Sequence, residues 1–305
     1  MPRPRPASPL ITLAVLVATV VAGCTGAASP SPSPSPSASP SASPSASPSG
    51  EWAFRLRATL SQALPPTATF AWLPVALVTE DSRVIVPGPV DLIYPGPLVR
   101  PLLERPLTEA GWAAIVAEAR AQGLLTGKSD FTGGSTLPGG ATGHLRLVVD
   151  GVRYDLLGDP SRVVRCGATR CIPEPGTPEA FAAFWSRLPD LAGWLGAALG
   201  PETAYRPTGW AILVGVPPEM QPPASAETID WPLATPLATF GSPYPGDSSR
   251  RCGLVTGTDA TTLGPALLRA TELTRWRDSP VSAWLYGLVV RPILPGDTEL
   301  CGPAA

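Results

Sequence analysis

The sequence predicts an α+β fold: a mixed or antiparallel sheet with two to four helices packed on it, stabilised by disulfides. The first observation is an alternation of apolar and polar residues on both sides of Asp150-Gly151, which is typical of a β-hairpin. The second is the helical spacing of the apolar residues that follow Thr108. The third is the order of the elements, because strand and helix patterns mix without the regular alternation of an α/β protein.

The N-terminus has the pattern of an exported protein. Arg3 and Arg5 precede an apolar run over 10–22, whose roughly 13 residues are fewer than the ~20 that span a bilayer. This pattern predicts a secretory signal peptide over 1–23. Its end, Val21-Ala22-Gly23-Cys24, resembles the lipobox of bacterial lipoproteins. The resemblance implies that Cys24 carries a diacylglyceryl anchor, with the chain on the extracytoplasmic side of the cell membrane. An ordinary cleaved signal is the alternative.

The composition divides the remaining chain. Residues 24–50 are almost entirely Ser, Pro and Ala, which predicts a disordered, extended stalk. Residues 51–305 are predicted to form a single globular region, with two sub-halves, 51–200 and 201–305, as the alternative. Without the signal peptide, 20 basic and 24 acidic residues give a net charge of −4, which argues against a nucleic-acid partner.

Four cysteines remain after Cys24, and an even number in an exported domain predicts two disulfides. Three pairings exist, and we favour Cys166 with Cys171 and Cys252 with Cys301. A zinc site is the alternative, but its usual signature has two close cysteine pairs and this chain has one. We predict no metal and no cofactor.

The first half contains two expected strands, one helix and the hairpin. Apolar residues at 70–78 and 84–86 flank a turn, and Pro74 predicts that the first of these strands is an edge strand or has a bulge. The helix is expected to begin after Thr108 as N-cap and to end at Gly123. The hairpin register pairs Val149, Leu147 and Leu145 with Val152, Tyr154 and Leu156 on one buried face, and Arg146 with Asp155 on the other.

The second half is less regular. Thr177-Pro178 begins a helix that ends before Pro189, and a shorter helical piece is expected over 191–199. Strands are expected over 210–214, 253–255 and 283–290, the last of them buried because it is almost entirely apolar. A helix is expected over about 259–274. Residues 217–250 are proline-rich and irregular, with Trp231-Pro232-Leu233 as the segment that packs onto the core.

Several short stretches together resemble a group of uncharacterised lipoproteins of high-GC, actinobacterial-type bacteria. Besides the lipobox they are Tyr94-Pro95-Gly96-Pro97, Gly123-Leu124-Leu125, Trp231-Pro232-Leu233, Cys252, Trp276 and Arg291-Pro292-Ile293-Leu294-Pro295 before Cys301. The resemblance implies a Cys252–Cys301 disulfide and one unit that continues to the C-terminus. It implies no activity and no catalytic residue.

Two catalytic or phosphate-binding patterns are incomplete. Between Gly123 and Gly127, before Lys128-Ser129, three residues stand where a phosphate-binding loop has four, and the segment follows a helix instead of a strand. Gly246-Asp247-Ser248 resembles a hydrolase nucleophile segment, but its base would have to be His144, the only histidine, on the wet face of the hairpin. We therefore predict no catalytic residue.

The tryptophans and one loop are the remaining candidates. Trp112, Trp185, Trp210 and Trp284 lie in apolar helices and strands and are expected in the core. Trp52, Trp231 and Trp276 are less well explained and form a candidate ligand platform. The glycine-rich segment over 131–140 is expected to be a surface loop, with a lid over a pocket as the alternative.

These observations predict a lipid-anchored envelope protein whose folded region binds a protein partner, a wall polymer or a small ligand without catalysis. One alternative is an envelope hydrolase that uses two carboxylates, because evenly distributed acids can meet in space. Another is a solute receptor for a transporter, which shares the same tethered layout. Two close carboxylates in a deep cleft would favour the hydrolase, two similar lobes the receptor, and a flat apolar patch a protein partner.

Overall fold

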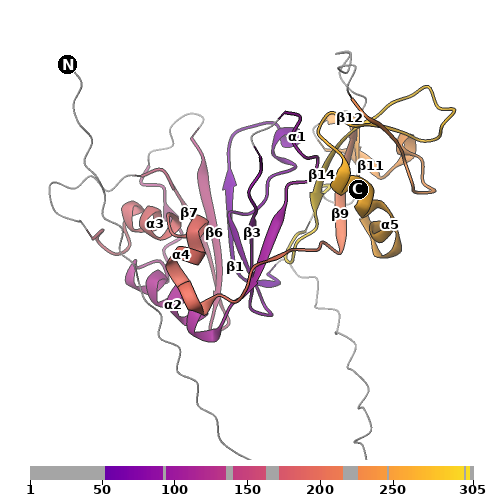
Figure 1. Ribbon diagram of the computed structural model, residues 1–305. Helices are drawn as coiled ribbons and strands as arrows, with labels where there is room; N and C mark the ends of the chain where they lie inside the picture. Colours follow the sequence, from indigo (N-terminus) through magenta and orange to yellow (C-terminus); the bar gives the residue numbers. More distant parts are fainter. Residues whose placement is uncertain are drawn as a thin grey trace, which may run out of the picture. The chain divides into compact units, whose positions relative to one another are not determined.

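Two β-sheets, each with helices against one face, organise the described part of the chain (Figure 1). The computed structural model describes residues 52–91, 94–134, 140–162, 172–215, 226–245, 247–298 and 300–302, all within one compact unit, 47–305. The predicted signal peptide, Cys24, the stalk, Cys166 and Cys171 lie outside the described residues. None of the described helices has the length and apolar composition needed to cross a membrane.

The first sheet is mixed, with the strand order β5-β7-β6-β1-β2-β3-β4-β8, in which only β5 and β7 pair in parallel. Helices α2 and α3 and the short α4 pack on one face of it, around a core of leucines, alanines and aromatic rings. The elements are β1 (Phe54–Ser61), α1 (Pro66–Thr69), β2 (Ala76–Thr79), β3 (Arg83–Pro87), β4 (Leu102–Pro106), α2 (Glu109–Ala121), β5 (Asp130–Phe131), β6 (Thr142–Val149), β7 (Val152–Gly158), α3 (Pro178–Trp185), η1 (Leu188–Asp190), α4 (Leu191–Leu195), η2 (Gly196–Ala198) and β8 (Thr203–Ala204).

The second sheet is antiparallel, with the order β11-β12-β9-β14, and a separate parallel pair joins β10 and β13. Its strand β9 is buried along its whole length, because α5 covers one face and Phe70 packs on the other. The elements are β9 (Gly209–Gly215), β10 (Thr228–Asp230), η3 (Leu237–Thr239), β11 (Ser242–Tyr244), β12 (Asp247–Thr256), α5 (Gly257–Arg269), β13 (Arg275–Arg277) and β14 (Gly287–Pro292). The predicted α+β class and the predicted apolar strand at 210–214 are thus confirmed.

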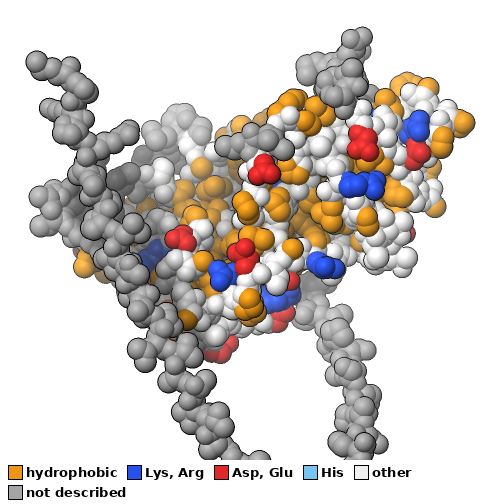
Figure 2. Space-filling view, in the orientation of Figure 1, with side chains coloured by type: hydrophobic (Ala, Val, Ile, Leu, Met, Phe, Trp, Pro, Cys, Tyr) orange, Lys and Arg blue, Asp and Glu red, His pale blue; other side chains and the backbone are white. Residues whose placement is uncertain are grey.

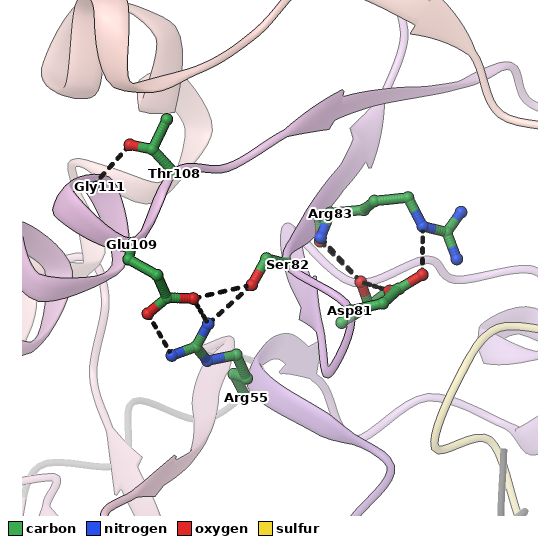
Figure 3. A network of polar contacts seen from close by, with 8 residues as sticks. Arg55, Asp81, Ser82, Arg83, Thr108, Glu109 and Gly111 are labelled. Atoms are coloured by element: carbon green, nitrogen blue, oxygen red, sulfur yellow. Dashed lines mark hydrogen bonds and ion pairs between the residues drawn. The ribbon is translucent and has the colours of Figure 1, made fainter. Parts of the chain in front are cut away.

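Helix α2 has the predicted ends. The Thr108 hydroxyl accepts a hydrogen bond from the Gly111 N–H at 3.2 Å, and Gly123 takes a positive φ of 68° just beyond the helix. Figure 3 shows Arg55 of β1 pointing toward the carboxylate of Glu109. Arg55 Nη1 donates to Glu109 Oε1 at 2.8 Å and to the Ser82 hydroxyl at 2.7 Å. The first turn of α2 is therefore held to β1 and to the turn before β3.

The hairpin of β6 and β7 also has the predicted register. Val149 pairs with Val152, and Arg146 pairs with Asp155. The Nε atom of Arg146 lies 3.6 Å from the Oδ2 atom of Asp155. The buried face stops short of the turn, because Val152 is 51% exposed. The predicted face is correct, but its burial does not extend to both ends of the hairpin.

Several predicted boundaries are wrong. Pro74 precedes β2, which lies inside the sheet between β1 and β3, so the missing N–H of this proline removes no ladder hydrogen bond. Helix α5 ends at Arg269 instead of residue 274. The last strand is shifted toward the C-terminus, and its residues alternate between buried and half-buried. Trp284 precedes this strand and is 69% exposed, which corrects its assignment to the core.

A bulge in β1 gives the first sheet a second apolar face. The register shifts between Phe54 and Leu56, so that Leu56 faces the helices while Phe54 joins a cluster on the opposite side. This cluster includes Leu77 of β2, Ile85 of β3 and, from the segment after β14, Leu294. The C-terminal segment therefore packs against the first sheet after leaving the second.

Ionic contacts hold the same segment. Asp297, whose side chain is 1% exposed, pairs with Arg57 of β1 and with Arg291 of β14. Its Oδ2 atom lies 2.9 Å from Arg291 Nη2 and accepts a hydrogen bond from the Leu294 N–H at 2.8 Å. Arg57 also donates from Nη1 to the Pro295 carbonyl at 3.3 Å. We call Arg57, Asp297 and Arg291 the ionic clasp, because they connect the two sheets.

The predicted disulfide between Cys252 and Cys301 is confirmed, with 5.3 Å between the Cα atoms. It closes a loop across a sequence separation of 49 residues. In the chain-entropy account, a loop of this length stabilises the folded state by about 4 kcal/mol. The bond attaches the end of the C-terminal segment to β12.

Replacing Asp297 by Asn should lower the free energy of unfolding by about 3–5 kcal/mol, because it leaves two largely buried guanidinium groups without their counter-ion. Urea denaturation of the purified protein measures the change. The matched control is Asp230→Asn, which removes an ion pair with Arg277 in which Asp230 is 48% exposed and should lower the free energy of unfolding far less. Equal costs for the two variants would contradict the role of the clasp.

The Glu109 carboxylate should make stability depend on pH. The hydrogen bond from Arg55 lowers its pKa in the folded state, so its contribution is present at neutral pH and is lost as the pH falls through that lowered pKa. Glu109→Gln should therefore lower Tm at pH 7, and its Tm should approach that of the wild type below about pH 4. The control is Glu202→Gln, an exposed carboxylate without an ion pair among the described residues. A Tm difference that persists unchanged at pH 3 would contradict this assignment.

Candidate functional site

Hydrophobic side chains cover much of the surface visible in Figure 2, with charged groups standing singly or in small sets between them. Most protein surfaces expose apolar atoms, so exposure alone does not identify a site. A groove is more informative, and the described residues form one with a volume of about 610 Å³. This volume lies within the ~300–1,000 Å³ typical of small-ligand pockets.

Three segments line this groove: residues 99–102 before and at the start of β4, residues 204–208 from β8 to β9, and one side of α5. Trp210 of β9 lies at its base and is 2% exposed. Gly264 of α5 faces that ring, since a Cβ atom built there would lie 3.8 Å from the indole nitrogen. Leu268, which is 64% exposed, continues the apolar wall to the surface.

Two arginines supply the charge of the groove. Arg100 and Arg206 are exposed, and neither forms an ion pair within the described part of the chain. No carboxylate is among the described lining residues of the groove. Arg100 also borders another hollow that contains Asp91 and Glu272. Neither carboxylate is within ion-pair distance of an arginine or lysine among the described residues. The groove thus combines apolar walls with a cationic rim, an arrangement suited to a ligand with an apolar body and one anionic group.

A hollow of about 330 Å³ adjoins the groove and shares Tyr205 and Arg206 with it. Burial raises the pKa of the Tyr205 phenol, which stays protonated at neutral pH and can donate a hydrogen bond. Burial would also raise the pKa of Asp81, but hydrogen bonds from Thr79 and Arg83 lower it on balance. Asp297, a second carboxylate of this hollow, belongs to the ionic clasp. Glu80, the third, is exposed and forms no ion pair among the described residues, so two of the three carboxylates are engaged by arginines.

The candidate tryptophan platform is wrong for Trp231 and Trp276. They are 5% and 0% exposed, and their rings pack edge to face with centroids 6.0 Å apart. The proline-rich segment places Trp231 against the core, where its Nε1 atom donates to the Thr235 carbonyl at 2.8 Å. Trp52 is half-buried, with Arg146 and Arg153 5.4 and 5.5 Å from its ring centroid.

The structure does not assemble the other sequence patterns into sites. His144 of β6 is hydrogen-bonded through Nε2 to Asp155, while Ser248 lies in β12 of the other sheet. Lys128 donates to the Gly176 carbonyl at 2.8 Å, which supports a loop after α2 rather than a phosphate-binding loop. Within the glycine-rich segment 131–140, residues 135–139 lie outside the described part, so its role as a lid stays untested.

The sequence analysis did not select the residues of the groove. One weak signal was available, because three of the six Arg-Pro pairs, those at 100–101, 206–207 and 291–292, each contribute at least their proline to the groove. A residue before proline is restricted to extended conformations, which suits a rigid lining segment. That signal says nothing about which of these segments meet.

Comparison of the chain with protein-family models, curated protein sequences and solved structures finds no match. The chemistry of the groove is therefore inferred from its own residues. Its volume, its apolar walls and its two rim arginines are the observations that bear on function.

Proposed function

We propose that the protein is a lipid-anchored envelope protein whose folded region binds small amphipathic anions without catalysis. Lipidation at Cys24 would hold it on the extracytoplasmic side of the cell membrane, and the stalk over 24–50 would separate the folded region from the bilayer. The groove beside α5 is the binding site. Its ligand has an unbranched or aromatic apolar body and a single carboxylate.

The observation that carries this proposal is the groove with Trp210 at its base and the two arginines at its rim. Apolar walls favour the ligand body through the area removed from water, about 25 cal/mol per Å². A guanidinium at the rim can bind a carboxylate through two parallel hydrogen bonds. Because Arg100 and Arg206 have no ion-pair partner among the described residues, an anionic ligand does not have to displace one.

The other functions considered for the chain find less support. A carboxylate-pair hydrolase needs two free carboxylates at a cleft, whereas no described carboxylate lines the groove and two of the three in the adjoining hollow are bonded to arginines. A two-lobed receptor would have similar lobes, whereas one sheet has eight strands and the other four. A protein or wall-polymer partner remains compatible with the anchor and the stalk, but no feature of the described residues favours it as the groove favours a small ligand.

Decanoate is a suitable probe, and isothermal titration calorimetry with the purified protein should detect its binding. Thr261→Trp places a large ring in the groove and should weaken binding at least tenfold. Thr262→Trp is the matched control, because Thr262 is also exposed on α5 but does not line the groove. Arg206→Glu should weaken binding by a similar factor through charge reversal, whereas Arg269→Glu, an exposed arginine outside the groove, should not.

Decanol, which has no charge, tests the role of the carboxylate. It should bind the wild type more weakly than decanoate does, and Arg206→Glu should leave its affinity unchanged. If decanoate fails to bind, or if Thr261→Trp and Thr262→Trp bind it equally, the groove is not the site. The proposed function would then be wrong in its ligand class, and crosslinking in the cell envelope would test a protein partner.

A further inference from the structure

A further, smaller hollow lies beside the ionic clasp. Its volume is about 250 Å³, and both arginines of the clasp line it. The end of β1 and the turn after it contribute Thr59, Ser61 and Gln62, and Trp72 borders it from the segment before β2. It shares no lining residue with the groove.

The charges around this hollow do not balance. Among the described residues, Asp297 is the one acidic group within ion-pair distance of Arg57 and Arg291, whose side chains are only 12% and 11% exposed. Two largely buried arginines at the edge of the hollow therefore share one carboxylate.

At least one N–H donor of Arg291 also lacks an acceptor among the described residues. Its Nη2 atom donates to both oxygens of Asp297, whereas its Nε atom is buried and has no acceptor among the described residues. A guanidinium carries five N–H donors, and one carboxylate shared with Arg57 cannot accept from all of them. Burial and the neighbouring Arg57 lower the pKa of Arg291, and Asp297 opposes this effect. An oxyanion in the hollow would offset the excess positive charge.

The rest of the lining selects among oxyanions. Hydroxyl and amide groups from Thr59, Ser61 and Gln62 can bind ligand hydroxyls, and the Trp72 indole can pack against the apolar face of a sugar ring. The volume lies just below the range of pockets that hold drug-sized ligands, which restricts the occupant to about one ring. We infer that this hollow binds an acidic monosaccharide unit, with its carboxylate or phosphate toward Arg57 and Arg291.

Isothermal titration calorimetry of the purified protein with glucuronate, glucose 6-phosphate and glucose tests the inference. At least one of the two acidic sugars should bind, and glucose should bind at least tenfold more weakly. Preference for glucuronate would identify a sugar carboxylate, and preference for glucose 6-phosphate a sugar phosphate. Binding should weaken at high salt, since charge carries the recognition.

Two single-residue changes provide a matched pair that leaves the clasp intact. Gln62→Glu adds a negative charge at the rim of the hollow and should weaken acidic-sugar binding at least tenfold, whereas Ala63→Glu adds the same charge one residue away, outside the lining.

A third variant, Arg291→Lys, changes the clasp itself. It keeps the positive charge but removes the planar guanidinium, and it should also weaken binding. Its Tm must be close to that of the wild type for this comparison.

Absence of binding by both acidic sugars, or equal effects of Gln62→Glu and Ala63→Glu, would overturn the inference and leave the clasp with a structural role only. Decanoate separates this result from that of the groove. Gln62→Glu should leave decanoate binding unchanged, and Thr261→Trp should leave acidic-sugar binding unchanged. Each site can therefore fail without the other.

Discussion

The interaction on which the tertiary structure most depends is the burial of one carboxylate, that of Asp297, between Arg57 and Arg291. A buried charge is unfavourable unless it is paired, so the segment after β14 is stable only where both guanidinium groups reach it. Because Arg57 belongs to the first sheet and Arg291 to the second, this requirement positions the C-terminal segment across both. Leu294 and the Cys252–Cys301 disulfide hold the same segment before and after the carboxylate.

This constraint also positions the groove and the hollow beside the clasp, which are the two sites to which we assign ligands. Pro292 follows Arg291 and lines the groove, while Arg291 itself lines the smaller hollow beside the clasp. A buried set with more cations than anions is a poor device for stability, since an apolar replacement of the same shape often stabilises as well or better. Such departures from the rules of stable cores are expected at functional sites. The unbalanced clasp is therefore the reason why we propose a ligand for the hollow beside it.

Both proposed ligands are anions, although the chain as a whole carries a net charge of −2. The local arrangement decides this, because arginines line the groove and the hollow, and no described carboxylate lines either of them. Arginine suits both sites through its planar fork and its weak hydration, which lower the cost of placing it against apolar walls. The groove adds apolar area for a chain or ring, and the hollow adds hydroxyl and amide groups for a sugar. The two sites therefore differ in what they select beyond charge.

Local patterns in the sequence determined α2, the hairpin around Asp150-Gly151 and the buried strand β9, because caps, turns and apolar periodicity act within a few residues. The predicted signal peptide, lipid anchor and stalk also rest on the sequence alone. The tertiary structure decided the burial of Trp231 and Trp276, the exposure of Trp284 and the meeting of Arg57 with Asp297 across 240 residues. Contacts over such separations depend on the path of the whole chain, which neither composition nor periodicity encodes.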